Sequence, residues 1–254
     1  MFLLSRLRRA PLSALLLTAS IATLTGCSHR ARVSYAPPPA IGPYGNAEPG
    51  YQPAQPAPSP AMSADWQYVQ SHRPLFSEEG IASWYGPPYN HRRGADGQVF
   101  DEDQVSAAHR TLPLGSLIQV TNMRTGQTAV MRVTDRGPFV PGRILDLSEG
   151  AAKEVGIWRP GTGEVRIDVY YTPEPLDAGG RWAVQIGAFS SQRQAIRLED
   201  RLQRQYRSAS VIEFTGPTGE WVRIRPEDGN REIAVEIAQE LRPSEGEAYL
   251  VRLD

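Results

Sequence analysis

The chain has 254 residues, of which 40% are hydrophobic and 22% are charged. This composition excludes a membrane protein with many spans and a chain that is disordered throughout, and the length leaves room for two modest domains. Lys plus Arg number 27 and Asp plus Glu number 28, which gives a net charge of −1. Binding to a phosphate backbone requires a surplus of basic side chains, so we expect no nucleic-acid partner.

Cysteine and histidine are scarce in this sequence. A single cysteine, Cys27, excludes an intramolecular disulfide and a cysteine-based metal cluster. Four histidines in the whole chain argue against a histidine-rich metal site. We therefore expect neither a metal nor another cofactor.

Residues 1–26 have the organisation of a cleaved signal peptide. Three arginines, at positions 6, 8 and 9, precede an uncharged and mostly apolar stretch at 10–25. This stretch is shorter than the roughly 20 residues of a membrane-spanning helix. The sequence LTGC at 24–27 resembles the lipobox of bacterial lipoproteins, which implies lipidation of Cys27. Ser28 follows, where an inner-membrane retention signal usually has Asp, so the resemblance implies an outer-membrane anchor that faces the periplasm. A chance cysteine in an ordinary signal peptide is the alternative.

Residues 27–77 are rich in proline, with nine prolines between Pro37 and Pro60. No periodic apolar pattern is available to build a core, so we expect a disordered, extended tether. About 50 such residues reach on the order of 100 Å, since polyproline II advances about 3.1 Å per residue.

Residues 78–172 alternate in short runs that predict a small β-barrel. Strands are expected at 117–121, 128–133 and 165–171, with a hairpin loop between the first two. One short helix is expected at 149–155, with Ser148 as its N-cap and Gly156 just past its end.

A linker at 173–180 leads to a second domain at 181–254, where the elements follow the order βαββαβ of a ferredoxin-like sandwich. Ser191 to Gln194 predict a capping box before the first helix. Asn230 is expected to cap the second helix, which would bury Ile233, Ile237 and Leu241.

Five ordered sequence blocks resemble the six-stranded double-psi β-barrel of the rare lipoprotein A (RlpA) family. The blocks are GIASWYG at 80–86, GADGQVFD at 94–101, AAHRTLPLGS at 107–116, VTDRGPF at 133–139 and GRILDLS at 142–148. WAVQIGAFSS at 182–191 resembles the opening of a SPOR domain, a module that binds peptide-free glycan strands at the division septum. The resemblance implies a septal lytic transglycosylase that cleaves such strands without water, with division-site proteins as further partners.

The family implies a Glu, a His and an Asp as catalytic groups. His109 and Asp135 are present here, but the Glu position is Gln98, and an amide cannot donate a catalytic proton. Loss of a general acid typically costs a factor of 10² to 10⁴, so either the reaction is disabled or Asp135 carries it alone. Arg136 is expected to lower the pKa of Asp135 and weaken it as an acid.

Several side chains have competing interpretations. His109 orients Asp135, holds the substrate or is a loop histidine bonded to backbone. Asp146 is interpreted as a satisfied structural carboxylate. A neighbouring carboxylate can also replace the missing Glu. The candidates for that replacement are Asp96, Asp101, Glu102 and Asp103.

Binding of the glycan is assigned to two groups of side chains. Trp84, Tyr85 and Arg136 are the candidates in the barrel, although packing in the core is the default for the two aromatic rings. In the second domain, strand parity predicts Gln185, Trp221 and Arg223 on the open face of the sheet. The rival functions are a non-catalytic lipoprotein that binds the wall and, third, expansin-like loosening of polymers without bond cleavage.

Overall fold

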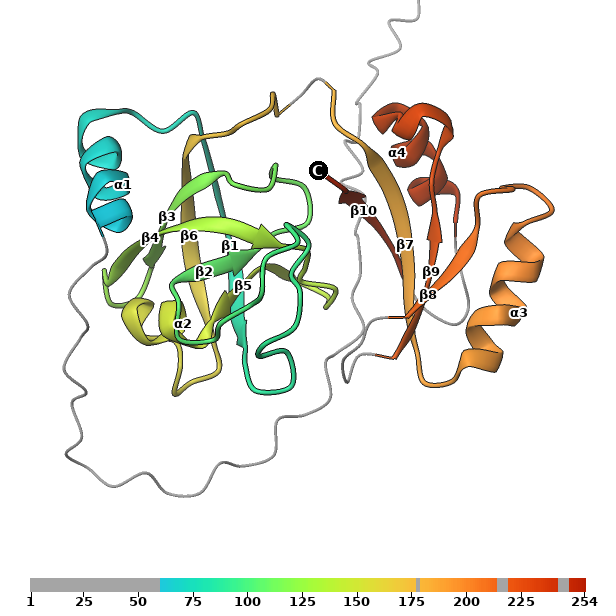
Figure 1. Cartoon of the computed structure of the whole chain (residues 1–254), viewed down its shortest axis with the longest axis horizontal. Helices are drawn as coiled ribbons and strands as arrows, with labels where there is room; N and C mark the ends of the chain where they lie inside the picture. The colour runs from blue at the N-terminus through green and yellow to red at the C-terminus, as the bar shows by residue number, and fades with distance from the viewer. Residues whose placement is uncertain (1–59, 177–178, 214–218, 242–246) are drawn as a thin grey trace, which may run out of the picture. The chain divides into compact units, whose positions relative to one another are not determined.

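The computed structural model describes residues 60–176, 179–213, 219–241 and 247–254. They form a closed barrel and a separate sheet with two helices, labelled in Figure 1. The predicted signal peptide, Cys27 and the tether up to residue 59 lie outside the described residues. Among the residues that are described, no helix is long and apolar enough to span a membrane.

The first domain is the predicted six-stranded barrel. Its strands are β1 (Phe76–Tyr85), β2 (Ser106–Ala108), β3 (Leu117–Asn122), β4 (Thr128–Asp135), β5 (Arg143–Ser148) and β6 (Thr162–Tyr171). They close in the order β1-β5-β2-β4-β3-β6. The pairs β1/β5 and β2/β4 are parallel and the rest are antiparallel. All six strands contribute to one apolar core, which includes Ala82, Ala107, Ile118, Val133, Leu145 and Ile167.

Helix α2 (Glu149–Val155) has the predicted bounds and both predicted caps. The Ser148 hydroxyl oxygen accepts hydrogen bonds from the backbone N–H groups of Ala151, at 3.1 Å, and Ser106, at 3.2 Å. Gly156 ends the helix at φ 75°, a conformation that glycine adopts without strain. Ser148 therefore joins the end of β5 to both α2 and β2.

The expectation of an extended tether up to residue 77 is wrong for its last part, where α1 (Pro60–Ser71) forms. Val69 is buried against Leu117 and Val130 of the barrel. Asp65 accepts two hydrogen bonds from Arg132 of β4, at 3.0 and 2.6 Å. The helix is stabilised by these tertiary contacts, which the composition of the proline-rich segment does not reveal.

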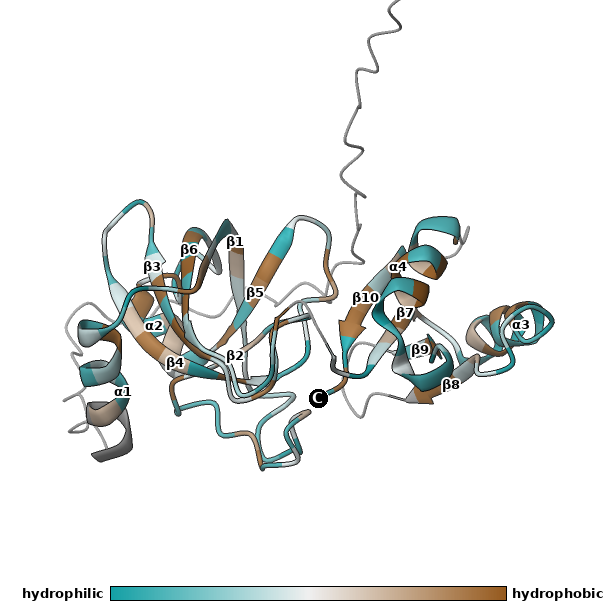
Figure 2. Cartoon of the chain, turned by 90° about the horizontal axis from the view of Figure 1, so that it is seen from above, coloured by the Kyte–Doolittle hydropathy of each residue, from teal (hydrophilic) through white to brown (hydrophobic). Residues whose placement is uncertain are grey.

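The second domain has the predicted βαββαβ order. Its elements are β7 (Trp182–Phe189), α3 (Gln192–Leu202), β8 (Ser210–Glu213), β9 (Glu220–Ile224), α4 (Arg231–Glu240) and β10 (Glu247–Arg252), with a short 3₁₀ turn (Glu227–Gly229) before α4. The sheet order is β10-β7-β9-β8, and both helices pack on one of its faces (Figure 1). Figure 2 shows hydrophobic residues along β5 of the barrel and β7 of this sheet.

Two predicted details of these helices are wrong. Ser191 occupies the N-cap of α3, but its side chain accepts no capping hydrogen bond, and Gln194 instead bonds the hydroxyl of Ser190. In α4 the buried residues are Ala234 and Ile237, whereas Ile233 is 42% exposed. The cap at Asn230 is confirmed, since its side-chain oxygen accepts the Ile233 N–H at 2.9 Å.

The two N-cap serines give a matched test of these contacts. We expect Ser148→Ala to lower the stability of the barrel by about 2 kcal/mol, because two buried N–H groups lose their acceptor. Ser191→Ala should cost less than about 0.5 kcal/mol, since no capping bond is lost. Urea unfolding monitored for each domain measures both, and equal losses for the two variants would contradict this interpretation.

Candidate active site

An extra residue in β4 turns Asp135 to the outside of the barrel. Ala107 pairs with Val133, but Ala108 pairs with Asp135, so Thr134 is the additional residue of a β-bulge. Strict alternation would have placed Asp135 on the same side as Val133, which lies in the barrel core. The bulge instead aligns the half-buried Asp135 with Ala108 on the outer face.

The loop that follows β1 covers Asp135 with backbone groups. Gly94 donates to the Gln98 carbonyl at 2.8 Å, and Asp96 donates to the Thr134 carbonyl at 3.1 Å. The Asp135 Oδ1 atom accepts the N–H groups of Ala95, at 3.0 Å, and Arg136, at 2.8 Å. No described residue forms a hydrogen bond with Oδ2, so that oxygen is left to carry a proton or to meet a ligand.

Burial raises the pKa of the Asp135 carboxyl group from 3.8 to about 6. The two backbone N–H donors and the charge of Arg136 act in the opposite direction, while the nearby Asp96 carboxylate raises the pKa further. The expected lowering of this pKa by Arg136 is therefore wrong as a net effect, because desolvation outweighs it. Asp135 is suited to donate a proton near neutral pH.

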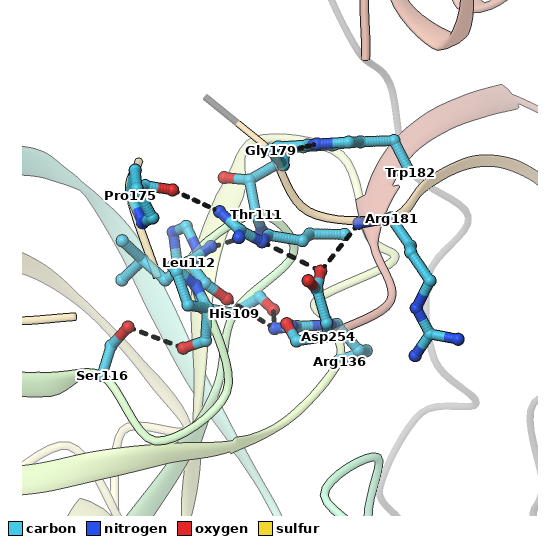
Figure 3. Close-up of polar contacts among 12 residues, drawn as sticks. His109, Thr111, Leu112, Ser116, Arg136, Pro175, Gly179, Arg181, Trp182 and Asp254 are labelled. Carbon is cyan, nitrogen blue, oxygen red and sulfur yellow. Dashed lines mark hydrogen bonds and ion pairs between the residues drawn. The ribbon is translucent and has the colours of Figure 1, made fainter. Parts of the chain in front are cut away.

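The guanidinium group of Arg136 is buried and donates hydrogen bonds to backbone carbonyl oxygens. Its Nη1 atom donates to the carbonyl oxygens of His109, at 3.0 Å, and Leu112, at 2.7 Å (Figure 3). These bonds hold the β2 loop against the end of β4. A substrate-binding role for the Arg136 side chain is therefore not supported by its position.

His109 is held by its own loop, as the structural alternative predicts. Its Nδ1 atom accepts the N–H groups of Thr111, at 3.2 Å, and Leu112, at 3.0 Å. With Nδ1 as an acceptor, Nε2 carries the proton and faces the Glu78 carboxylate at 3.4 Å. His109 contacts Asp135 through its backbone, whose N–H donates to the Asp135 carbonyl at 3.1 Å. It therefore supports the position of Asp135 and its ring does not exchange a proton with that side chain.

Trp84 and Tyr85 have different roles. Trp84 is partly buried against the barrel core and donates its Nε1–H to the Trp158 carbonyl at 3.1 Å, which is the packing role expected by default for this ring. Tyr85 lies on the outer face, where its ring stacks on Phe100 at 4.5 Å. Burial raises the pKa of its phenol well above the ordinary value, and the charges of Asp135 and Asp146 add to this effect.

Gln98 is exposed on the loop above Asp135. Its backbone N–H donates to Asp96 Oδ1 at 2.9 Å, and its amide makes no hydrogen bond with a described residue. Among the carboxylates considered as replacements for a Glu here, Asp96 acts electrostatically on Asp135. Glu102 instead accepts a bond from Asn90 at 3.0 Å.

The sequence did not reveal that Asp146 lies in line with Asp135 across neighbouring strands. Ala108 pairs with Asp135 on one side and with Asp146 on the other. The strand register that brings them together depends on pairing between β2, β4 and β5, which no local motif records. Within the described ranges, no cluster of three or more His, Cys, Asp or Glu side chains is placed to hold a metal ion.

The three side chains predicted on the open face of the second domain are buried or half-buried. Strand parity is confirmed, since Val222 and Ile224 pack under the helices while Trp221 clusters with Tyr249 and Val251 on the other face. However, Trp221 is 2% exposed and Gln185 is fully buried. Arg223, half-buried, donates to Gln185 Oε1 at 2.7 Å. The Tyr249 ring of β10 lies 6.0 Å from the Trp221 ring across β7, a contact that sequence parity alone did not predict.

Comparison with known proteins assigns both domains. Residues 77–167 match the family described as lytic transglycolase, and residues 178–252 match the SPOR domain. Three relatives are named endolytic peptidoglycan transglycosylase RlpA, the first of them as probable. They come from Synechocystis (53% identical, 35% of this chain and 28% of the relative), Pasteurella multocida (37%, covering 48% and 42%) and Helicobacter pylori strain J99 (32%, covering 52% and 51%). The chain thus spans about a quarter to a half of the length of these relatives.

Among solved structures, the apo expansin of Clavibacter michiganensis aligns with 18% identity and a TM-score of 0.33. That alignment covers 59% of this chain and 80% of the expansin. A similarity at this level carries no argument about function.

The raised pKa of Asp135 gives a test of its environment. A carboxyl group whose folded pKa exceeds its unfolded pKa stabilises the fold at low pH, and this contribution is lost as the pH rises through the folded value. Here the loss is complete above a pH of about 6 and reaches up to about 3 kcal/mol.

We therefore expect Asp135→Asn to stabilise the barrel at pH 8, because the buried charge is removed while Oδ1 still accepts its two N–H groups. At pH 4 the variant and the wild type should unfold at similar urea concentrations. An equal difference at both pH values would show that the Asp135 charge is not desolvated.

Proposed function

Because the chain belongs to the RlpA family and carries a C-terminal SPOR domain, we propose that it is an endolytic transglycosylase that cleaves peptide-free peptidoglycan strands. The observation that carries the proposal is Asp135, a desolvated carboxyl group with a free oxygen atom on the outer face of the barrel. Such a group supplies the proton that departure of a sugar requires.

The proposed reaction uses no water. Protonated Asp135 donates its proton to the oxygen that bridges two sugars, and the bond from C1 to that oxygen breaks. The 6-hydroxyl oxygen of the same sugar then bonds to C1, and its proton returns to a carboxylate. The products are one strand with a free hydroxyl and one strand with an anhydro-sugar end. Electrons and protons balance within the substrate and the enzyme, so no other reactant is needed.

Asp135 works here without the Glu that the family has at position 98. The Gln98 amide can hold a substrate hydroxyl by a hydrogen bond but cannot transfer a proton. This favours a second candidate function, that of a lipoprotein that binds septal peptidoglycan without cleaving it. The exposed and unbonded amide is the observation behind this alternative.

The proposed place of action is the division septum, on the periplasmic side of the outer membrane. Lipidation of Cys27 would anchor the chain, and the proline-rich residues that follow would let its domains reach the wall. The SPOR domain would bring the barrel to peptide-free glycans there, alongside other division-site proteins.

Activity distinguishes the two functions. We expect wild-type protein incubated with peptide-free glycans to release products with anhydro ends, detected by mass spectrometry. Asp135→Asn should reduce their formation by at least a factor of 10², because the proton donor is lost. Asp168→Asn, on β6 of the same barrel, is the control and should retain activity.

Retained activity in Asp135→Asn would contradict the assignment of the acid. If the wild type forms no product and Gln98→Glu does, the amide marks a lost catalytic group and the binding function is correct for the natural chain.

Binding by the second domain is tested at Arg223. If Arg223 binds the glycan, Arg223→Ala should weaken retention of the protein on peptide-free glycans several-fold. The change removes a half-buried guanidinium group that faces Gln185. Arg225→Ala, an exposed change two residues along the same chain segment, is the matched control. Equal retention of both variants in a pull-down would place the glycan site on another surface.

A further inference from the structure

Two carboxyl groups stand in one row on the outer face of the barrel. Ala108 of β2 pairs with Asp135 of β4 and also with Asp146 of β5. Side chains that are directly opposite on neighbouring strands point to the same face, and strands lie about 4.8 Å apart, so the two Asp Cα atoms are separated by about 10 Å. The residue between them, Ala108, is 3% exposed and contributes a single methyl group.

The turn after Asp135 passes close to Asp146. Gly137 follows at φ 154°, and a Cβ atom built there would lie 3.5 Å from Asp146 Oδ2 and 3.8 Å from the Ala108 Cβ atom. The chain therefore passes beside Asp146 at a residue without a side chain. About 19% of the Asp146 side chain is exposed.

We propose that Asp146 is a second catalytic carboxyl group, which accepts the proton of the sugar 6-hydroxyl while Asp135 protonates the bridging oxygen. The inference rests on the proposed transglycosylase function and deepens it. It assigns the work of the missing Glu to a residue that the sequence presents as structural.

The neighbours of the two carboxyl groups suit these different tasks. The Ser83 hydroxyl donates to Asp146, and Arg143 Nη1 lies 4.0 Å from the same carboxylate. Burial raises the pKa of Asp146, while the Ser83 bond and the charges of Arg143 and Arg110 act against that rise. Asp135 instead has a carboxylate neighbour, Asp96, which favours its protonated form. The surroundings of the two groups therefore differ, because only Asp135 has a carboxylate among the groups that shift its pKa.

Tyr85 lies near both carboxyl groups. Its hydroxyl is buried beside the Ser106 hydroxyl, whose hydrogen bond acts against the rise in the pKa of the phenol. Burial and the charges of Asp135 and Asp146 raise that pKa, so the hydroxyl stays neutral.

The step balances with two carboxyl groups. The 6-hydroxyl proton passes to the Asp146 carboxylate, and the Asp135 proton passes to the bridging oxygen. The C1–O6 bond forms as the bond from C1 to the bridging oxygen breaks. Exchange with solvent then returns a proton from Asp146 to Asp135, so neither an oxidant nor a co-reactant is required.

The test compares Asp146→Asn with a matched control in the purified chain. Asp168 on β6 also accepts a serine hydroxyl, from Ser77 at 2.5 Å, and an arginine N–H, from Arg166 at 2.9 Å. We expect Asp146→Asn to lower kcat by a factor of 10² to 10⁴, and Asp168→Asn to stay within about twofold of wild type. Turnover of Asp146→Asn within threefold of wild type would overturn the inference.

The pH profile separates a catalytic role from a structural one. For wild type, kcat/KM should fall above a pH of about 6 as Asp135 loses its proton, and fall again at low pH as Asp146 gains one. The residual activity of Asp146→Asn should still fall at high pH but should no longer fall at low pH. If both falls persist, Asp146 is not the base.

Ser83→Ala decides the matter if Asp146→Asn does not fold. This variant keeps the carboxylate but removes its hydroxyl donor, so the low-pH fall should move to higher pH. An unmoved profile would overturn the inference.

Two outcomes distinguish this inference from the proposed function. Full activity of Asp146→Asn beside an inactive Asp135→Asn defeats the inference alone. Absence of product from the wild type, with or without product from Gln98→Glu, defeats the transglycosylase function itself.

Discussion

The site depends on the removal of water from one carboxyl group. An exposed aspartate is ionised at neutral pH and has no proton to give, whereas burial without a compensating charge favours the protonated acid. In this barrel the bulge at Thr134 brings Asp135 to the outer face. The loop at 93–99 covers it, and one N–H group of that loop, from Ala95, binds one of its oxygen atoms. The second oxygen stays free, so the same arrangement desolvates the acid and leaves it able to react.

The side chains of Arg136 and His109 stabilise the loop beside Asp135. Arg136 binds the carbonyl oxygens of the β2 loop, and His109 accepts two N–H groups of that loop. Both side chains are motif residues, yet their contacts are with backbone. In this chain the family motif thus encodes a rigid frame around Asp135 as much as a set of reacting groups.

Much of the fold was accessible from sequence because it is local. The caps at Ser148 and Asn230, the hairpin of β3 and β4 and the alternation in β6 depend on neighbours within a few residues. The family blocks also pointed to Asp135, the carboxyl group on which the proposed function rests. Helix α1 was missed because tertiary contacts, and not its own composition, stabilise it.

The rest of the site was not accessible, since it arises between distant strands. The alignment of Asp146 with Asp135 requires the register of three strands, and the sign of the Asp135 pKa shift requires its burial. Parity correctly placed Trp221 on the face opposite the helices, but parity does not tell which residues pack against that face. Sequence patterns gave the direction of a side chain here, and the structure was needed for its surroundings.

The state of the Asp135 carboxyl group is the claim on which the account rests, and it can be measured directly. Carboxyl ¹³C chemical shifts of labelled aspartate, followed from pH 3 to pH 8 with Asp135→Asn used to assign the signal, give its pKa. The account predicts a midpoint of about 6, set by burial. A midpoint near 4, the ordinary value for a solvated aspartate, would contradict it.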